Sequence, residues 1–215
     1  MELSEAELNA KTNQAVILPL AYFPPIDYFR LILNQEEVLF DLYEHFHKQY
    51  YYNRCIIASP NGVLKLTVPI LHRGIRTALK DVRISYEYHW RTIHWRSMEA
   101  AYRRSPYFEF YEHHFAPVFS DFKPEFLVDW NLKIFEIINT ILNNKIKVSF
   151  TNEYLENHEN MNDKRHLASP SELSAHAKNV HPYHQVFEER QGFIPNLSII
   201  DLLFCEGNNT NQYLK

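Results

Sequence analysis

The chain has 215 residues, of which 46% are hydrophobic and 22% are charged, and its formal net charge is −4 at pH 7. This composition excludes a disordered or fibrous protein and supplies enough apolar side chains for a core, while the net negative charge disfavours a general nucleic-acid binder. The widely spaced glycines allow no G-x-G-x-x-G motif, P-loop or G-x-S-x-G elbow, which disfavours the common nucleotide cradles and the esterase nucleophile. The four glycines are Gly62, Gly74, Gly192 and Gly207.

The first part of the chain predicts a strand, a helix and a second strand. Residues 15–22 form a short apolar run bounded by prolines, which is typical of a buried strand. Helical spacing of apolar side chains predicts a helix over 26–33, and residues 37–43 are the second strand candidate. Residues 54–59 and 63–70 are extended runs joined by Pro60-Asn61-Gly62, a strong β-hairpin signal.

The middle of the chain changes from strand to helix. After a short strand over 82–85, Ser85 is suited to cap a helix that ends near Ser105-Pro106. Its predicted shared face is formed by Trp90, Ile93, Ser97 and Ala101. Residues 107–119 are predicted to be helical, and an amphipathic helix runs from Pro124 to Asn143.

The last part of the chain contains a short strand, a long loop and a closing helix. Residues 147–150 are the strand, and the polar, His-rich residues 156–186 indicate a loop with one short helix. Residues 197–204 predict a buried closing helix. Since strands precede helices, the sequence predicts an α+β fold, with a mixed β-sheet from the N-terminal half packed against helices from the middle and C-terminus. The opening strand–helix–strand unit leaves an α/β fold as the alternative.

No internal repeat or linker divides the chain, so we expect a single domain over residues 1–215, with its core over about 16–207 and a loose segment over 1–14. Two cysteines 150 residues apart indicate reduced thiols in a cytoplasmic protein. The polar start of the chain resembles no signal peptide, and the longest apolar run, 15–26, contains three prolines. We therefore expect a cytoplasmic protein with no membrane span.

The positive charge is concentrated in one segment. Residues 72–104 carry eight Lys and Arg against three acidic side chains. This segment forms either a cationic patch for a phosphate or carboxylate ligand or an ordinary solvated surface. The twelve histidines suggest a metal site, but His89 and His94 are five residues apart and diverge on a helix, and no other pair has a third ligand nearby. We therefore expect no metal.

Two polar residues in apolar surroundings, Arg54 and His94, are candidates for chemistry. Arg54 follows Asn53 at the start of a strand, so it needs either a structural carboxylate, such as Asp27 or Asp41, or an anionic ligand. His94 is either a general base or a packed residue with satisfied hydrogen bonds. Aromatic residues make up 15% of the chain, and many of them occur in clusters. These rings either pack in the core or line a flat-walled pocket for a sugar or a nucleotide base.

Several collinear segments resemble one bacterial family. They are Ala21-Tyr-Phe-Pro-Pro-Ile-Asp-Tyr-Phe29, Tyr52-Asn-Arg-Cys55, Leu66-Thr-Val-Pro-Ile70, Trp90-Arg-Thr-Ile-His94, Tyr102-Arg-Arg-Ser-Pro-Tyr-Phe108 and Gly192-Phe-Ile-Pro-Asn-Leu-Ser-Ile-Ile-Asp-Leu-Leu-Phe204. In this order, over about 16–207, the chain resembles the WbqC-like protein family. A Gly-rich segment found in longer members is replaced here by the His-rich loop, so no function of that segment, about 155–185, is carried over.

The resemblance implies a role in bacterial surface-polysaccharide (O-antigen) biosynthesis. Our first hypothesis is a transferase acting on an activated amino-sugar, with His94 as base, Arg54 holding an anionic group and Asn53 orienting the substrate. The matching positions that would complete the substrate site are Tyr22, Tyr28, Trp90, Tyr102 and Tyr107. The ligand would be a small molecule such as a nucleotide-sugar or acyl donor, and the sequence identifies no cofactor. The alternative is a non-catalytic binding or scaffold protein of the same assembly system.

Overall fold

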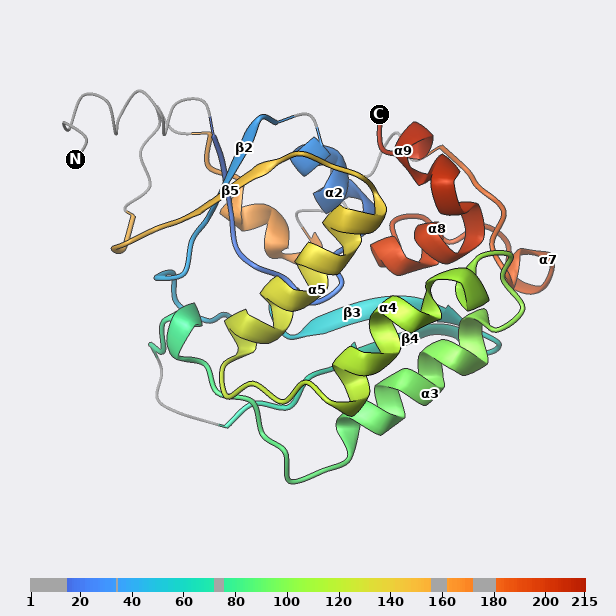
Figure 1. The fold of residues 1–215 in the computed structure, drawn as a ribbon, viewed down its shortest axis with the longest axis horizontal. Helices are drawn as coiled ribbons and strands as arrows, with labels where there is room; N and C mark the ends of the chain where they lie inside the picture. The colour runs from blue at the N-terminus through green and yellow to red at the C-terminus, as the bar shows by residue number, and fades with distance from the viewer. Residues whose placement is uncertain (1–14, 34, 72–75, 156–161, 172–180) are drawn as a thin grey trace.

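A small parallel sheet is built from strands far apart in the sequence. The computed structural model describes residues 15–33, 35–71, 76–155, 162–171 and 181–215. The predicted loose segment and much of the His-rich loop therefore lie outside the described residues. The helices and strands are arranged as Figure 1 shows.

The opening strand–helix–strand prediction is confirmed. Strand β1 (Val16–Leu18), helix α2 (Ile26–Leu33) and strand β2 (Glu37–Phe40) form a βαβ unit with parallel strands. Strand β5 (Lys147–Phe150) pairs with the other edge of β2, also in parallel. Both opening strands are shorter than predicted. Strand β1 ends before Pro19, which cannot donate to a ladder. After β2 the chain turns because the Asp41 carboxylate accepts hydrogen bonds from two following backbone N–H groups.

The other edge of β1 is covered by a later segment of the chain. Ile17 forms a parallel bridge with Asp163, since its N–H donates to Asn162 and its carbonyl accepts from Lys164. The order across this layer is therefore residues 162–164, β1, β2 and β5. The chain first advances from β1 to β5 and then returns to the opposite side of β1, which creates a topological switch point beside β1.

The predicted β-hairpin is also confirmed. Strands β3 (Arg54–Ser59) and β4 (Gly62–Thr67) pair antiparallel through a two-residue turn, and Gly62 has φ +107 at its end. The predicted strand over 82–85 is replaced by two isolated bridges, Ile70 to Ile84 and Arg83 to Phe126. The described strands thus form two separate sheets, where we expected one mixed sheet.

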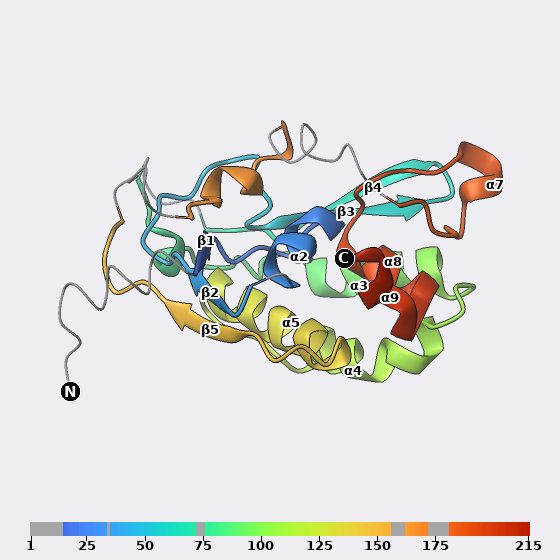
Figure 2. The same cartoon turned by 90° about the horizontal axis from the view of Figure 1, so that it is seen from above.

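Three helices lie along one side of the hairpin and the parallel strands, as Figure 2 shows. They are α3 (Trp90–Tyr102), α4 (Phe108–Ser120) and α5 (Leu127–Ile141). The predicted start of the first of these helices is wrong. The Ser85 hydroxyl accepts a bond from Glu87 N–H in a local turn, and α3 begins five residues later.

The predicted shared face of α3 is also wrong in part. Ile93 is 58% exposed, whereas the buried side contains His94. The residues buried along α3 are Trp90, His94, Met98, Ala101 and Tyr102. This face is selected by partners from elsewhere, because Tyr22 bonds to His94 and Trp130 packs edge-on against Trp90 at 4.9 Å.

The C-terminal segment forms short helices that close the core. They are α7 (Glu188–Gln191), α8 (Ile199–Glu206) and α9 (Thr210–Tyr213). Ser198 caps α8, which contacts α2, α4 and β3. Short 3₁₀ turns occur at Leu79–Asp81, Arg165–Ala168 and Gly207–Asn209.

The architecture confirms the α+β class. One hydrophobic cluster extends from Val16 to Leu214 and includes residues of both sheets and the long helices. Cys55 and Cys205 are free thiols, and both are buried. Among the described residues, no helix is both long and apolar enough to cross a membrane.

Candidate functional site

His94 lies in the core, between a tyrosine and a tryptophan. Its Nδ1 is 2.8 Å from the Tyr22 hydroxyl, its ring also hydrogen-bonds to the backbone of Thr67, and the Trp90 ring lies 5.1 Å away. Burial lowers the pKa of His94 to about 4, so the ring is neutral at pH 7. The contacts on two sides favour the packed-residue interpretation. The role of His94 as base stays a prediction.

Tyr22 and Trp90 are held by the same core. Tyr22 is fully buried, its hydroxyl hydrogen-bonds to His94, and its backbone N–H donates to the carbonyl of Tyr51. The Trp90 indole N–H donates to the carbonyl of Ser85 at 3.0 Å. The two rings therefore fix the imidazole in place, and the structure joins three of the predicted site residues in one cluster.

Arg54 and Asn53 lie next to this cluster, at the start of β3. Arg54 is paired in register with Thr67, the residue whose backbone contacts His94. The Asn53 amide donates to the carbonyl of Val68 at 2.8 Å. Asn53 Oδ1 and Arg54 Nε are buried, and neither has a hydrogen-bond partner among the described residues. Two consecutive residues thus each carry a polar atom without a described partner, one an acceptor and the other a cationic donor.

The carboxylates that the sequence suggested for Arg54 have other partners. Asp27 pairs with Arg30 at 3.0 Å, and Asp41 pairs with Arg165. Burial lowers the pKa of Arg54, and the neighbouring Tyr51 opposes this effect. Since a half-buried guanidinium without a carboxylate is costly, the geometry favours the ligand interpretation of Arg54 over a structural ion pair.

Tyr102 belongs to a different, closed network. Its hydroxyl donates to Asp201 at 2.8 Å, and Tyr183 donates to the other carboxylate oxygen at 2.7 Å. Burial raises the pKa of Asp201 to about 6, and hydrogen bonds, including one from the backbone of Ala58, oppose this rise. Gln185 in turn donates to the Tyr183 hydroxyl at 3.1 Å. The network joins α3, β3 and α8, and it supports the fold at this position.

Tyr107 also packs against the C-terminal segment. Its backbone N–H donates to the carbonyl of Phe204, and its ring covers Gly207. A Cβ atom at Gly207, where φ is +55, would lie 2.4 Å from the Tyr107 ring. Tyr102 and Tyr107 thus make their described contacts with the C-terminal segment and are not part of the His94 cluster.

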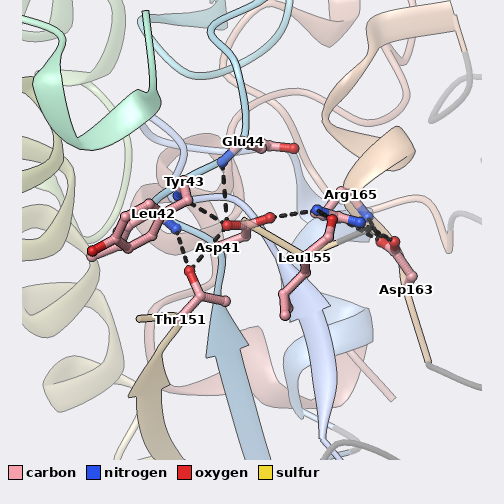
Figure 3. A network of polar contacts seen from close by, with 8 residues as sticks. All are labelled: Asp41, Leu42, Tyr43, Glu44, Thr151, Leu155, Asp163 and Arg165. Atoms are coloured by element: carbon pink, nitrogen blue, oxygen red, sulfur yellow. Dashed lines mark hydrogen bonds and ion pairs between the residues drawn. The ribbon is translucent and has the colours of Figure 1, made fainter. Parts of the chain in front are cut away.

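A second buried polar cluster lies where the parallel strands end, and the sequence analysis did not predict it. Figure 3 shows Asp41, directly after β2, accepting hydrogen bonds from the Thr151 hydroxyl and from the backbone N–H groups of Tyr43 and Glu44. Its second oxygen binds Arg165. Because carboxyl ends of parallel strands meet at one edge, side chains that follow β2 and β5 converge here.

Arg165 connects this edge to the switch point beside β1. Its guanidinium binds Asp163 through two nitrogens, at 2.6 to 3.1 Å, and donates to the carbonyl of Leu155 at 3.0 Å. Burial lowers the pKa of Arg165, but its bonds to Asp163 and the pair with Asp41 outweigh burial and raise it. The pKa of Asp163 shifts in the opposite direction, because its bonds to Arg165 lower it although burial raises it. The positive charge of Arg165 is thus shared between two carboxylates.

The Glu44 backbone N–H donates to Asp41, and the Glu44 side chain lies beside the Asp41–Arg165 pair. Its side chain is buried, and its carboxyl group faces the Tyr52 hydroxyl. Burial raises the pKa of Glu44 to about 8, and the facing Tyr52 hydroxyl lowers it. The Glu44 carboxyl group and the Tyr52 hydroxyl are therefore each other's partners in this buried position. Predicted site residue Tyr28 is a neighbour, and its hydroxyl donates to the carbonyl of Pro19.

The cationic segment is partly neutralised by local acids. A groove of about 640 Å³ beside α3 is lined by Arg103, Arg104 and the apolar side chains of Val186 and Phe187. Arg103, however, binds Glu99 and Glu112, so this end of the segment fits the solvated-surface interpretation. Within the described ranges, no group of three or more potential ligands that could hold a metal ion is found.

The comparisons with known proteins identify the family. The model of the WbqC-like protein family matches residues 21–177. The match covers most of the chain, and the protein belongs to this family. The matched range includes the His94 cluster, Arg54 and the polar cluster around Asp41 and Arg165, and it ends before Asp201. No curated protein and no solved structure matches the chain.

Proposed function

We propose that the protein acts in bacterial surface-polysaccharide biosynthesis as a group transferase on an activated amino-sugar. Membership of the WbqC-like family supports the setting. The observation that carries the proposal is that Arg54 Nε and Asn53 Oδ1, on consecutive residues, have no described protein partner. A guanidinium suits a phosphate or carboxylate of the donor, and an amide oxygen accepts from a sugar hydroxyl or amide.

The His94 cluster is linked to Arg54 through the hairpin. Arg54 lies opposite Thr67 in the hairpin, and Thr67 is hydrogen-bonded to His94. A neutral imidazole can accept a proton, which would suit transfer to an amine. In this proposal Tyr22 and Trp90 hold the ring, and a ligand must displace the Tyr22 contact before His94 can act as base.

The test is a thermal-shift screen with UDP-N-acetylglucosamine and acetyl-CoA as probes. A probe at about 100 times its Kd should stabilise the wild-type protein by about 2.7 kcal/mol. Arg54→Lys keeps the charge but loses the planar fork, so it should reduce probe affinity by about 1.5–3 kcal/mol. Arg96→Lys, on the exposed side of α3, is the matched control. Equal affinities in all three proteins, or no stabilisation by either probe, would contradict the proposal.

A second candidate, a non-catalytic binding or scaffold protein, is favoured by the buried contacts of His94. For this function His94→Gln should lower the melting temperature and leave probe affinity unchanged, with no turnover in either protein. For a transferase, the same change should lower turnover by about 10²–10⁴-fold with little loss of binding.

A further inference from the structure

The β3–β4 hairpin has one face toward the core and one toward the outside. Cys55 and its register partner Leu66 belong to the buried core. Because successive side chains of a strand point to opposite faces, Arg54, Lys65 and Thr67 point away from this core. Lys65 and Thr67 are exposed and Arg54 is half-buried, in agreement with this alternation. The three side chains therefore share the outer face of the hairpin.

The register of the hairpin brings these three side chains together. Arg54 is directly opposite Thr67, and Lys65 is opposite Ile56, so Lys65 is a diagonal neighbour of Arg54. Opposite residues on one face have Cβ atoms about 4.5–5.5 Å apart, and diagonal neighbours are about 7–8 Å apart, which long side chains can bridge. Two cationic groups and one hydroxyl can thus converge on a single ligand.

No carboxylate neutralises these two cations within the part of the chain that the structure describes. Arg54 and Lys65 take part in none of the salt bridges there, and Arg54 Nε has no hydrogen-bond partner. The other outward positions of the two strands are apolar, namely Ile56, Ala58 and Val63. The outer face therefore carries two uncompensated positive charges, which a bound anion would stabilise.

A diphosphate matches this arrangement better than a carboxylate does. The planar fork of Arg54 can donate to two oxygens of one phosphoryl group, and the Lys65 ammonium can act as a point charge on the next. The Thr67 hydroxyl can donate to a further oxygen. A carboxylate carries one charge and two oxygens, so it would leave one of the two cations unmatched.

We infer that Arg54, Lys65 and Thr67 form a binding site for the diphosphate group of a ligand on the outer face of the β3–β4 hairpin. The inference rests on the Arg54 contact of the proposed function, and it adds two residues and a ligand class to that contact. It requires no particular reaction, because nucleotide-sugars and acyl-CoA donors both contain a diphosphate.

The test is isothermal titration calorimetry at constant ionic strength with UDP, pyrophosphate, orthophosphate and glucuronate as probes. UDP and pyrophosphate should bind more tightly than orthophosphate and glucuronate. Lys65→Gln should weaken UDP binding about tenfold and Thr67→Val about threefold, since each removes one contact to a charged oxygen. Lys65→Arg keeps the charge and should stay within about twofold of wild type. Lys133→Gln, on the exposed side of α5, is the matched control and should bind UDP as wild type does.

The outcomes separate this site from the proposed function. The inference is overturned if Lys65→Gln binds UDP as tightly as Lys133→Gln, if orthophosphate or glucuronate binds as tightly as pyrophosphate, or if neither UDP nor pyrophosphate binds. Binding of UDP-N-acetylglucosamine that is weakened by Arg54→Lys but unchanged in Lys65→Gln would overturn this site and leave the proposed function. Weakening in Lys65→Gln, in a protein that turns over no amino-sugar donor, would leave this site and overturn the transferase.

Discussion

Replacement of Glu44 by Gln should make the protein more stable at alkaline pH. Gln has the shape and hydrogen-bonding capacity of the protonated acid, but it cannot ionise. In the wild-type protein, burial raises the pKa of Glu44 from 4.5 to about 8. The folded state therefore keeps a proton that the unfolded state has lost. This contribution to stability is complete below pH 4.5 and is lost as the pH rises through about 8.

The size of the effect follows from the two pKa values. The interval from 4.5 to about 8, at about 1.4 kcal/mol per pKa unit, corresponds to a change of about 5 kcal/mol in the free energy of unfolding. Asp41, Asp163, Arg165 and Tyr52 face Glu44, and their contributions are present in both proteins. The difference between Glu44→Gln and wild type therefore isolates Glu44.

The assay is chemical denaturation followed by tryptophan fluorescence at a series of pH values. Near pH 5 the two proteins should have similar stability, and the variant should gain about 1.4 kcal/mol per pH unit above that, up to about pH 8. Glu109→Gln, on the exposed side of α4, should show no such gain. A constant difference between Glu44→Gln and wild type at every pH would refute the reasoning that burial keeps Glu44 protonated.

Three other predictions test the polar network, the core histidine and the C-terminal helix. Arg165→Met leaves the buried Asp41 without its cationic partner and should lower the free energy of unfolding by about 3–5 kcal/mol in chemical denaturation. The double variant with Asp41→Asn should recover part of this loss, and no recovery would contradict a direct pair. Because burial lowers the pKa of His94 from 6.5 to about 4, wild-type stability should fall as the pH drops between these values. His94→Gln should remove this dependence, and an unchanged acid slope in that variant would disprove the assignment. Deletion of residues 193–215 removes α8, whose apolar side chains are buried, and should abolish cooperative melting; a normal melt of the truncated protein would count against a structural role.

Local sequence patterns predicted most of the elements. The Pro60-Asn61-Gly62 turn specified the hairpin because only certain residues adopt its backbone angles, and Gly62 takes φ +107 there. The α+β class followed from the order of strands and helices. The exposed position of Ile93 did not follow, because helical spacing alone offered two overlapping faces on α3.

The candidate site was predictable only in part. The sequence showed that Arg54 needed an anion, but the choice between a protein carboxylate and a ligand depended on where Asp27 and Asp41 lie. Both carboxylates were taken by other arginines. Glu44 had no signal of its own, although an acidic residue soon after a predicted parallel strand would have been a reason to look.

The sequence by itself determined the elements whose causes are local: the turn residues, the apolar periodicity of the helices and the prolines that end β1 and precede α2. Only the tertiary structure decided which polar groups are satisfied. Arg165 reaches Asp41 across 124 positions of the chain, and Tyr22 reaches His94 across 72. Such partners meet because the parallel layer and the helices bring their edges together, and the same packing leaves Asn53 and Arg54 with unmatched polar atoms. Hydrogen-bond satisfaction is a property of the packed whole, so no local pattern encodes it.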